Sequence, residues 1–250
     1  MPVSDSEQEA SHAGREWFRT TRWSLVLLAG KGDLPQAAEA LEKLCRTYWY
    51  PLYAYVRCKG HKAEEAQDLT QGFFAHLLAK NYLARADPAK GRFRDFLLTG
   101  LKYFLINEWD RVRGKKYGGG QIPISLDAKT AETWYGQEPA TETTPETLYE
   151  KRWALTVLEQ ALTRLRDEQR VKGKGRQFEL LKPLLSSRPQ AGDYDRLAQE
   201  LGTTRNAVAM AVSRLHKRYR ALLEEEIAHT VASPDEVQEE LRWLLKVLSR

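Results

Sequence analysis

The stretch YDRLAQELGTTRNAVAMAVSRLHKRYR, residues 194–220, organises the rest of the chain. Its apolar positions recur at steps of three and four and predict two short helices joined by a tight turn. Ala198 gives the first helix a small residue, Gly202 can take a positive φ in the turn, and Val208 anchors the second helix. We interpret this pattern as a helix-turn-helix.

The second of these helices has a basic face, with no acid between Arg205 and Arg220. A helix with only positive side chains lacks the ion pairs that a merely solvated face uses, and it can approach phosphates and base edges. An ordinary helical hairpin with solvated basic residues is the alternative. We expect DNA binding in the major groove through these residues: Arg205, Asn206, Arg214, Lys217 and Arg218.

Length and composition limit the number of domains, the fold class and the kind of partner that this motif can belong to. The chain has 250 residues and a formal net charge of +5, which leaves room for two small domains and favours an anionic partner. Helical spacing recurs almost throughout, so the expected fold class is all-α. Cys45 and Cys58 suggest neither a disulfide framework nor a zinc site. Apolar runs are too short to span a membrane, and we expect a soluble cytoplasmic protein with no membrane partner.

Residues 63–79 predict a helix with two distinct faces. One face is apolar, and the other carries Glu65, Asp68 and Gln71. Acids in a first turn also stabilise a helix N-terminus, which is the simpler explanation for Glu65. That explanation is weaker for Asp68 and Gln71, because both lie beyond the first turn.

Residues 93–113 predict another long helix, with an aromatic core face and a basic exposed side that includes Arg94. Basic residues interleaved with Tyr103 and Trp109 are typical of single-strand binding, in which cations follow the backbone and bases stack on rings. A solvated basic end that completes the helix C-terminus is the alternative. The candidate single-strand contacts are Arg92, Lys102, Tyr103, Asn107, Arg111 and Arg113.

The remaining segments connect or flank these elements. Residues 117–147 are rich in Pro, Thr and Glu with little periodicity, so they predict a flexible acidic linker, either solvated or lying in a basic groove. Residues 1–19 predict a disordered tail. Ser233, Pro234 and Glu236 predict the start of an amphipathic helix within residues 229–250, which either packs on the second domain or binds a regulator.

Three stretches in this order resemble the extracytoplasmic-function group of the bacterial sigma-70 family of RNA polymerase sigma factors. They are AEEAQDLTQGFFAHLL at 63–78, GRFRDFLLTGLKYFLINEWDRVRGKK at 91–116, and the stretch at 194–220. The resemblance implies two helical domains: sigma region 2 at residues 20–116, and sigma region 4 at residues 148–228 with its helix-turn-helix at 193–220. The linker at 117–147 would join them.

The resemblance also implies a role for each surface. Glu65, Asp68 and Gln71 would bind the β′ clamp helices of core RNA polymerase, the basic aromatic helix would melt and hold the −10 element, and the reading helix would contact the −35 element. The polymerase β flap and promoter DNA are further implied partners, and an anti-sigma factor or another regulator is left open. Ala209 and Met210 on the reading helix contact either a thymine methyl group or the protein core.

Two other classes of protein compete with this interpretation. A stand-alone helix-turn-helix regulator would bind DNA without polymerase, but it gives the polar face with Asp68 and the basic aromatic helix no role. An enzyme is the third class. The sequence contains no nucleotide-binding glycine loop, nucleophile elbow or metal-ligand spacing, so we expect no catalytic residues, no cofactor and no metal.

Overall fold

The computed structural model describes residues 35–79, 82–85, 87, 91–112, 128–136, 144–187, 189–228, 231 and 233–249. Within these ranges every regular element is a helix, which confirms the predicted all-α class. None of the described helices is both long enough and apolar enough to cross a membrane. The chain divides into two compact units, unit 1 with residues Met1–Leu155 and Ala228–Arg250, and unit 2 with residues Thr156–Ile227.

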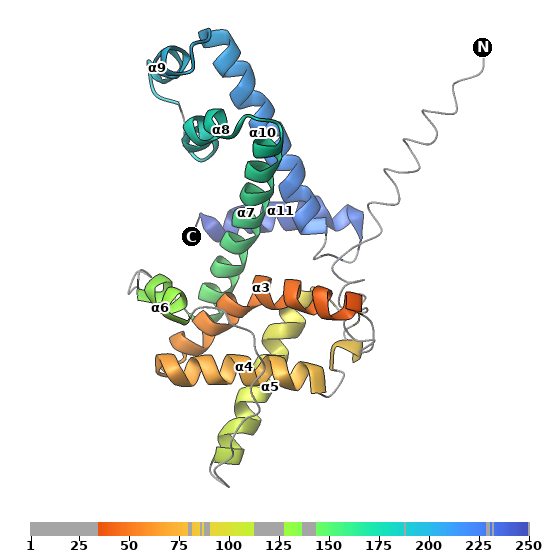
Figure 1. Ribbon diagram of the computed structural model, residues 1–250. Coiled ribbons are helices and arrows are strands. Elements are labelled where there is room, and N and C mark those ends of the chain that lie inside the picture. The colour runs from red at the N-terminus through yellow and green to blue at the C-terminus, as the bar shows by residue number, and fades with distance from the viewer. Residues whose placement is uncertain are drawn as a thin grey trace, which may run out of the picture. The chain divides into compact units, whose positions relative to one another are not determined.

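Unit 1 contains three long helices with shorter elements between them (Figure 1). The two helices predicted at residues 63–79 and 93–113 are present with nearly the predicted bounds. The elements are α3 (Pro35–Cys58), α4 (Ala63–Ala79), η1 (Tyr82–Arg85), α5 (Phe93–Val112) and α6 (Ala128–Gly136). The tail predicted at residues 1–19 lies outside the described residues.

Aromatic side chains form the centre of unit 1. Tyr48 of α3 meets Phe93 of α5 edge-on, with ring centroids 5.4 Å apart. Helix α5 approaches α4 closely at Gly100, where an added Cβ would lie 3.4 Å from the Phe73 ring. Because large rings bury much apolar area, this core fixes α3, α4 and α5 together and leaves one face of α4 and one of α5 toward solvent.

Helix α6 corrects part of the predicted linker, because residues 128–136 are helical and tied to α3. Arg57 donates from Nη2 to Glu132 Oε1 at 2.7 Å and from Nε to Glu132 Oε2 at 3.0 Å. These hydrogen bonds lower the pKa of Glu132 below its usual value. One acid of the predicted linker therefore has a specific partner, while residues 117–127 and 137–143 lie outside the described residues.

Helix α7 (Pro145–Val171) contributes residues to both units. Thr144 caps it, because its Oγ1 accepts from the Thr147 amide at 3.2 Å, and Pro145 fills the first helical position, which needs no amide donor. The helix therefore begins three residues before the start predicted for the second domain at 148.

Unit 2 holds the two helices predicted within residues 194–220. It uses the second part of α7, followed by α8 (Gly175–Leu181), η3 (Lys182–Leu185), α9 (Asp193–Glu200) and α10 (Arg205–Ala228) (Figure 1). Its core is mostly aliphatic, with Leu165, Leu197, Val208 and Leu222 among the buried residues.

The chain then returns to unit 1 through η4 (Pro234–Glu236) and α11 (Val237–Leu248). The amphipathic helix predicted in residues 229–250 is thus present, with a 3-10 turn before it. It belongs to unit 1 and contacts the first part of α7. Trp243 of α11 lies 5.8 Å from Trp153, measured between ring centroids, and its ring covers the guanidinium of Arg94.

Candidate nucleic-acid interface

The turn between α9 and α10 is built by local backbone chemistry. Gly202 has a φ of 61°, in the left-handed region that a Cβ disfavours. The Thr203 amide donates back to the Ala198 carbonyl at 2.9 Å and closes the end of α9. Thr204 Oγ1 then accepts from the Ala207 amide at 3.2 Å and caps the start of α10. These contacts fix the direction in which α10 leaves the turn.

Helix α10 has a buried stripe and, opposite it, an exposed polar face. Val208, Val212 and Leu215 are buried against the rest of unit 2. Residues on the opposite side follow the same helical steps and are all exposed. We call this set the reading face: Asn206, Met210, Ser213, Arg214 and Lys217. It contains no acid.

The sequence left two roles open for Met210, contact with a thymine methyl group or with the core, and its exposure argues against the second. Its side chain is 61% exposed, so it does not pack into the core. Arg214 Nε donates to the Met210 carbonyl at 3.3 Å, one turn along the helix. An apolar side chain at the middle of a polar reading face can contact a thymine methyl group.

Arg205 and Arg218 lie on either flank of the reading face. Arg205 is exposed, and its Nη1 is 3.8 Å from Asp195 Oδ2 on α9, a weak surface pair. Arg218 donates from Nη2 to Glu168 Oε1 at 2.6 Å and from Nη1 to Glu225 Oε1 at 3.2 Å. The hydrogen bonds from Arg218 lower the pKa of Glu168. Arg218 therefore joins α10 to α7, unlike the other predicted DNA contacts on α10.

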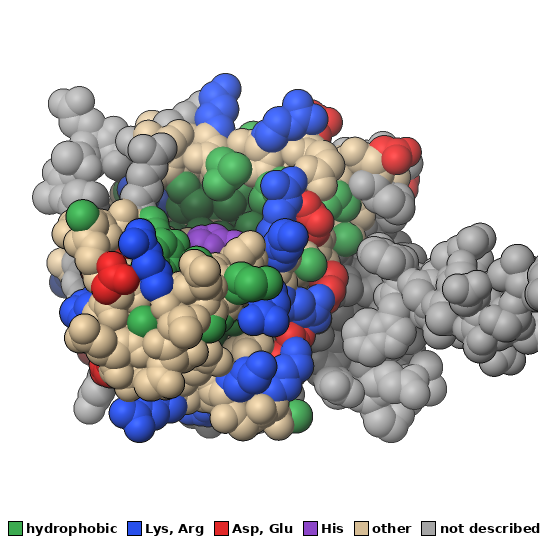
Figure 2. Space-filling model, turned by 90° about the horizontal axis from the view of Figure 1, so that it is seen from above, with side chains coloured by type: hydrophobic (Ala, Val, Ile, Leu, Met, Phe, Trp, Pro, Cys, Tyr) green, Lys and Arg blue, Asp and Glu red, His purple; other side chains and the backbone are tan. Residues whose placement is uncertain are grey.

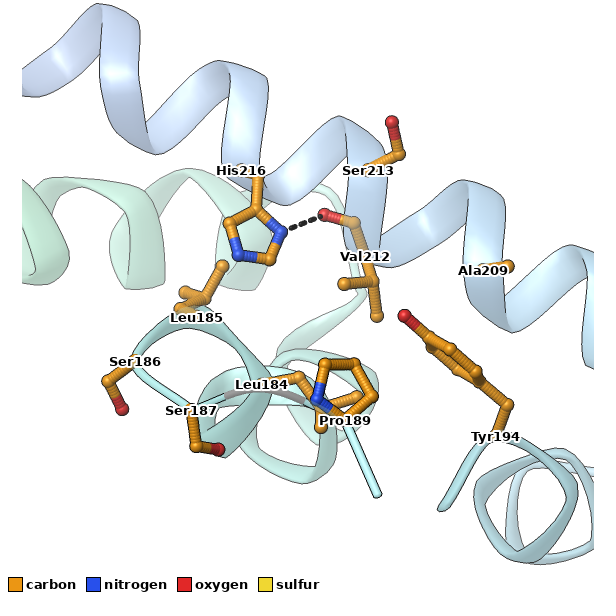
Figure 3. A pocket seen from close by; sticks show the side chains of 10 residues that line it. All are labelled: Leu184, Leu185, Ser186, Ser187, Pro189, Tyr194, Ala209, Val212, Ser213 and His216. Carbon is orange, nitrogen blue, oxygen red and sulfur yellow. Dashed lines mark hydrogen bonds between the residues drawn. The ribbon is translucent and has the colours of Figure 1, made fainter. Parts of the chain in front are cut away.

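A hollow of about 520 Å³ lies beside the reading face in unit 2. Lys and Arg side chains gather around this end of the molecule, and the hollow between them shows hydrophobic and histidine side chains (Figure 2). Its walls are His216 and nearby residues of α10, Tyr194 of α9, and the end of η3 with the segment after it (Figure 3).

The lining of this hollow does not resemble an active site. The Ser187 hydroxyl donates to the Pro183 carbonyl at 2.7 Å, which ties it to its own turn. His216 Nδ1 lies 3.1 Å from the Val212 carbonyl oxygen in the preceding turn of α10. No carboxylate lines the hollow to orient that imidazole for nucleophilic catalysis. The hollow lies along the flank of α10.

On unit 1, α5 exposes an apolar and polar face that suits stacking. Tyr103 is 63% exposed and Ile106 is 59% exposed, and Asn107 is exposed beside them, one turn from Tyr103. Bases stack on such rings whatever their identity. The described residues thus bring together Tyr103 and Asn107 from the predicted single-strand contacts. The side chain of Arg111 and all of Arg113 lie outside the described residues.

Lys102 lies on the flank of that face and has an internal partner. Its Nζ is 2.7 Å from Glu146 Oε1 at the start of α7. This contact lowers the pKa of Glu146, and Tyr55 Oη donates to the same carboxylate at 3.4 Å. Both Lys102 and Glu146 are about two-fifths exposed, so Lys102 can exchange this partner for a phosphate at modest cost.

Arg92 and Arg94 lie at the start of α5, where the sequence predicted exposed basic residues. For Arg94 that prediction is wrong, because its side chain is buried and forms an ion pair with Glu240. Burial lowers the pKa of Arg94 to about 10, against the opposing effect of Asp95. Arg92 is partly exposed, and its Nε lies 2.9 Å from Glu240 Oε2.

The polar face of α4 is solvent-exposed, as its pattern predicts. Glu65 and Asp68 are exposed and Gln71 is half-buried, and all three follow the helical spacing of one face. Glu65 Oε1 lies 3.0 Å from His61 Nδ1, so this acid has a local partner. Asp68 and Gln71 form the rest of this polar face.

Sequence reasoning assigned no role to Glu240, which lies three residues after Val237 and four before Leu244 on the apolar stripe of α11. An acid on such a stripe indicates a buried partner, because carboxylates are seldom fully buried alone.

Sequence reasoning also missed Ile106, because an isoleucine in a helix is usually interpreted as a core residue. Its exposure depends on how α5 packs, which no local pattern gives.

No group of three or more metal-ligating side chains occurs among the described residues. Comparison with known proteins found no matching family model, no similar curated protein and no similar solved structure.

Proposed function

We propose that this protein is a promoter-recognition subunit of bacterial RNA polymerase, a sigma factor of the extracytoplasmic-function type. The observation that carries the proposal is the reading face of α10, an acid-free polar surface opposite a buried stripe, on the second helix of a helix-turn-helix. Such a helix enters the major groove and contacts base edges. In this proposal Asn206, Arg214 and Lys217 contact the −35 element.

Unit 1 supports the second half of the proposal. Tyr103 and Asn107 on α5 offer a stacking platform for an unpaired strand, as opening the −10 element requires. Extruded bases lose stacking energy of a few kcal/mol, which exposed rings offset. Asp68 and Gln71 on α4 would bind core polymerase. No part of this proposal needs a cofactor or a catalytic residue.

The test is whether the purified chain binds core polymerase and directs initiation. Run-off transcription on genomic fragments, with mapped start sites, should give discrete promoters that share two sequence elements. Tight duplex binding by the free chain with no association with core would contradict the proposal and favour a stand-alone helix-turn-helix regulator.

Charge reversal on α4 sharpens this test. Asp68→Arg should abolish core binding while the chain stays folded, because the exposed carboxylate has no structural partner in the described residues. The matched control is Asp167→Arg, which reverses an exposed acid in unit 2. Equal loss in both variants would indicate a nonspecific charge effect and remove Asp68 from the interface.

A further inference from the structure

Helix α11, which no part of the proposed function uses, buries an acid against the first turn of α5. Val237, Leu241, Leu244 and Val247 form its buried apolar stripe, and Glu240 lies among them with no exposed surface. A buried carboxylate is costly unless a positive charge compensates it. Its compensation comes from α5, and this contact lies wholly within unit 1.

Two arginines share this one carboxylate. Arg94 pairs with Oε1 and Arg92 approaches Oε2 to 2.9 Å. Two tryptophans enclose the buried guanidinium, with Arg94 Cζ 3.7 Å from the ring centroid of Trp243 and 4.7 Å from that of Trp153. Both contacts with Glu240 are ion pairs.

The four charges at this site balance in number but differ in exposure. Arg94 and Glu240 are both buried, and the Asp95 carboxylate, 3.8 Å from Arg94, is largely exposed. Because Arg94 is sealed in, Arg92 is the guanidinium that solvent reaches, with its side chain 29% exposed. The Arg92 carbonyl accepts from the Asp95 and Phe96 amides at 3.1 and 3.2 Å, which fixes its backbone to the first turn of α5.

We propose that Glu240 is a positioning residue for DNA: it holds the Arg92 guanidinium at the start of α5, where it binds a phosphate of the unpaired strand. The inference rests on the proposed function, and it makes α11 part of the −10 surface. A competing role, in which Glu240 occupies the phosphate position and blocks it, fits less well. Arg92 stays partly exposed while it contacts Glu240, so a phosphate can reach it, and the apolar stripe of α11 is buried, unlike that of a lid that opens.

The experiment measures binding of a fluorescent single-stranded −10 oligonucleotide to the complex of core polymerase and full chain, across a series of salt concentrations. Arg92→Gln should weaken binding about tenfold, the effect of losing one hydrogen bond to a charged group. It should also reduce the salt dependence by about 0.7 in logarithmic slope, as for one phosphate contact with a single strand.

Glu240→Gln should reproduce both changes, because an amide keeps the shape but lacks the charge that holds Arg92. The double variant should lose nothing further. The matched control, Glu239→Gln, changes an exposed acid on the same helix and should bind as the unmodified chain does. Unmodified affinity and slope in a folded Glu240→Gln variant would overturn the proposal, and tighter binding would establish the blocking role instead.

Hydrogen exchange on the unmodified chain keeps the proposal testable if Glu240→Gln fails to fold. The amides of residues 237–248 should keep or gain protection when the oligonucleotide binds, and loss of protection would overturn the positioning role. Failure of the unmodified chain to bind core polymerase would contradict the proposed function itself. Binding by the unmodified chain that Glu240→Gln leaves intact would contradict only the role of Glu240.

Discussion

In unit 1 the ion pair of Arg94 and Glu240 is buried between helices, whereas in unit 2 the pair of Arg218 and Glu168 lies where water reaches both side chains. Both pairs join helices that are distant in sequence. The buried pair is costly to desolvate and selects one docking geometry, while the exposed pair costs little and gains little. The same residue types therefore specify structure in one unit and adjust stability in the other.

Among the variants that test this comparison, removal of the buried acid Glu240 should cause the largest loss of stability. Glu240→Ala leaves Arg94 buried without its partner, and we expect unit 1 to lose about 3–5 kcal/mol of unfolding free energy. Urea unfolding followed by tryptophan fluorescence measures this loss, because Trp153 and Trp243 enclose Arg94. Glu239→Ala is the control. A loss below about 1 kcal/mol would mean that the buried pair contributes no more to the unfolding free energy than an exposed pair does.

Backbone strain should have the next largest effect, and it tests unit 2. Gly202→Ala forces a Cβ into the left-handed region at a φ of 61°, although no atom within 4 Å would clash with it. We expect a loss of about 1–2 kcal/mol, measured by thermal unfolding. Gly175→Ala, at the start of α8, is the control because its φ is not positive. Equal effects would mean that packing, and not the turn, sets the cost.

Lowering the pH should weaken the exposed ion pair of Arg218 and Glu168. The pKa of Glu168 is lowered in the folded chain, so its contribution to stability is present above its ordinary pKa of about 4.3 and is lost as pH falls through the folded value. Glu168→Gln should reduce the loss of stability between neutral and acid pH by less than about 1 kcal/mol. Urea midpoints across that range measure it. An unchanged pH dependence would show that Arg218 gains nothing from the charge of Glu168.

The smallest effect concerns base reading on the exposed face of unit 2. If Met210 contacts a thymine methyl, replacing that thymine by uracil should cost about 0.8 kcal/mol of holoenzyme binding. Met210→Ala should remove the difference between the two bases, while Ser213→Ala should keep it. Equal sensitivity in the unmodified chain and in Met210→Ala would exclude Met210 as the contact.

Local pattern was enough to predict the helices that carry the candidate surfaces. The steps between Ala66, Phe73 and Leu77 gave α4, and the small, turn and anchor residues at 198, 202 and 208 gave α9 and α10. These helices and their turn depend on residues that lie close together in the sequence, so the spacing of apolar residues predicts them.

Partners distant in sequence could not be predicted in this way. Helix α6 is tied to α3 by the pairing of Glu132 with Arg57, and no sequence pattern near either residue identifies the other as its partner. Arg94 was predicted to be exposed because charged side chains are seldom buried without a partner, and it is buried because Glu240 pairs with it and Trp243 covers it. Arg218 was predicted as a DNA contact, and the sequence around it does not identify Glu168 of α7 as its partner. Side chains that face other helices need the fold before their role is known.

The division of unit 1 between residues before 155 and after 228 has a consequence for synthesis on the ribosome. Unit 2 is one continuous segment and can fold once it has emerged, because domains fold as units during translation. Arg94 emerges early, yet its partner on α11 is translated only after all of unit 2. A nascent chain therefore completes unit 1 only after unit 2 has been translated, so a truncated chain lacks the buried ion pair of unit 1.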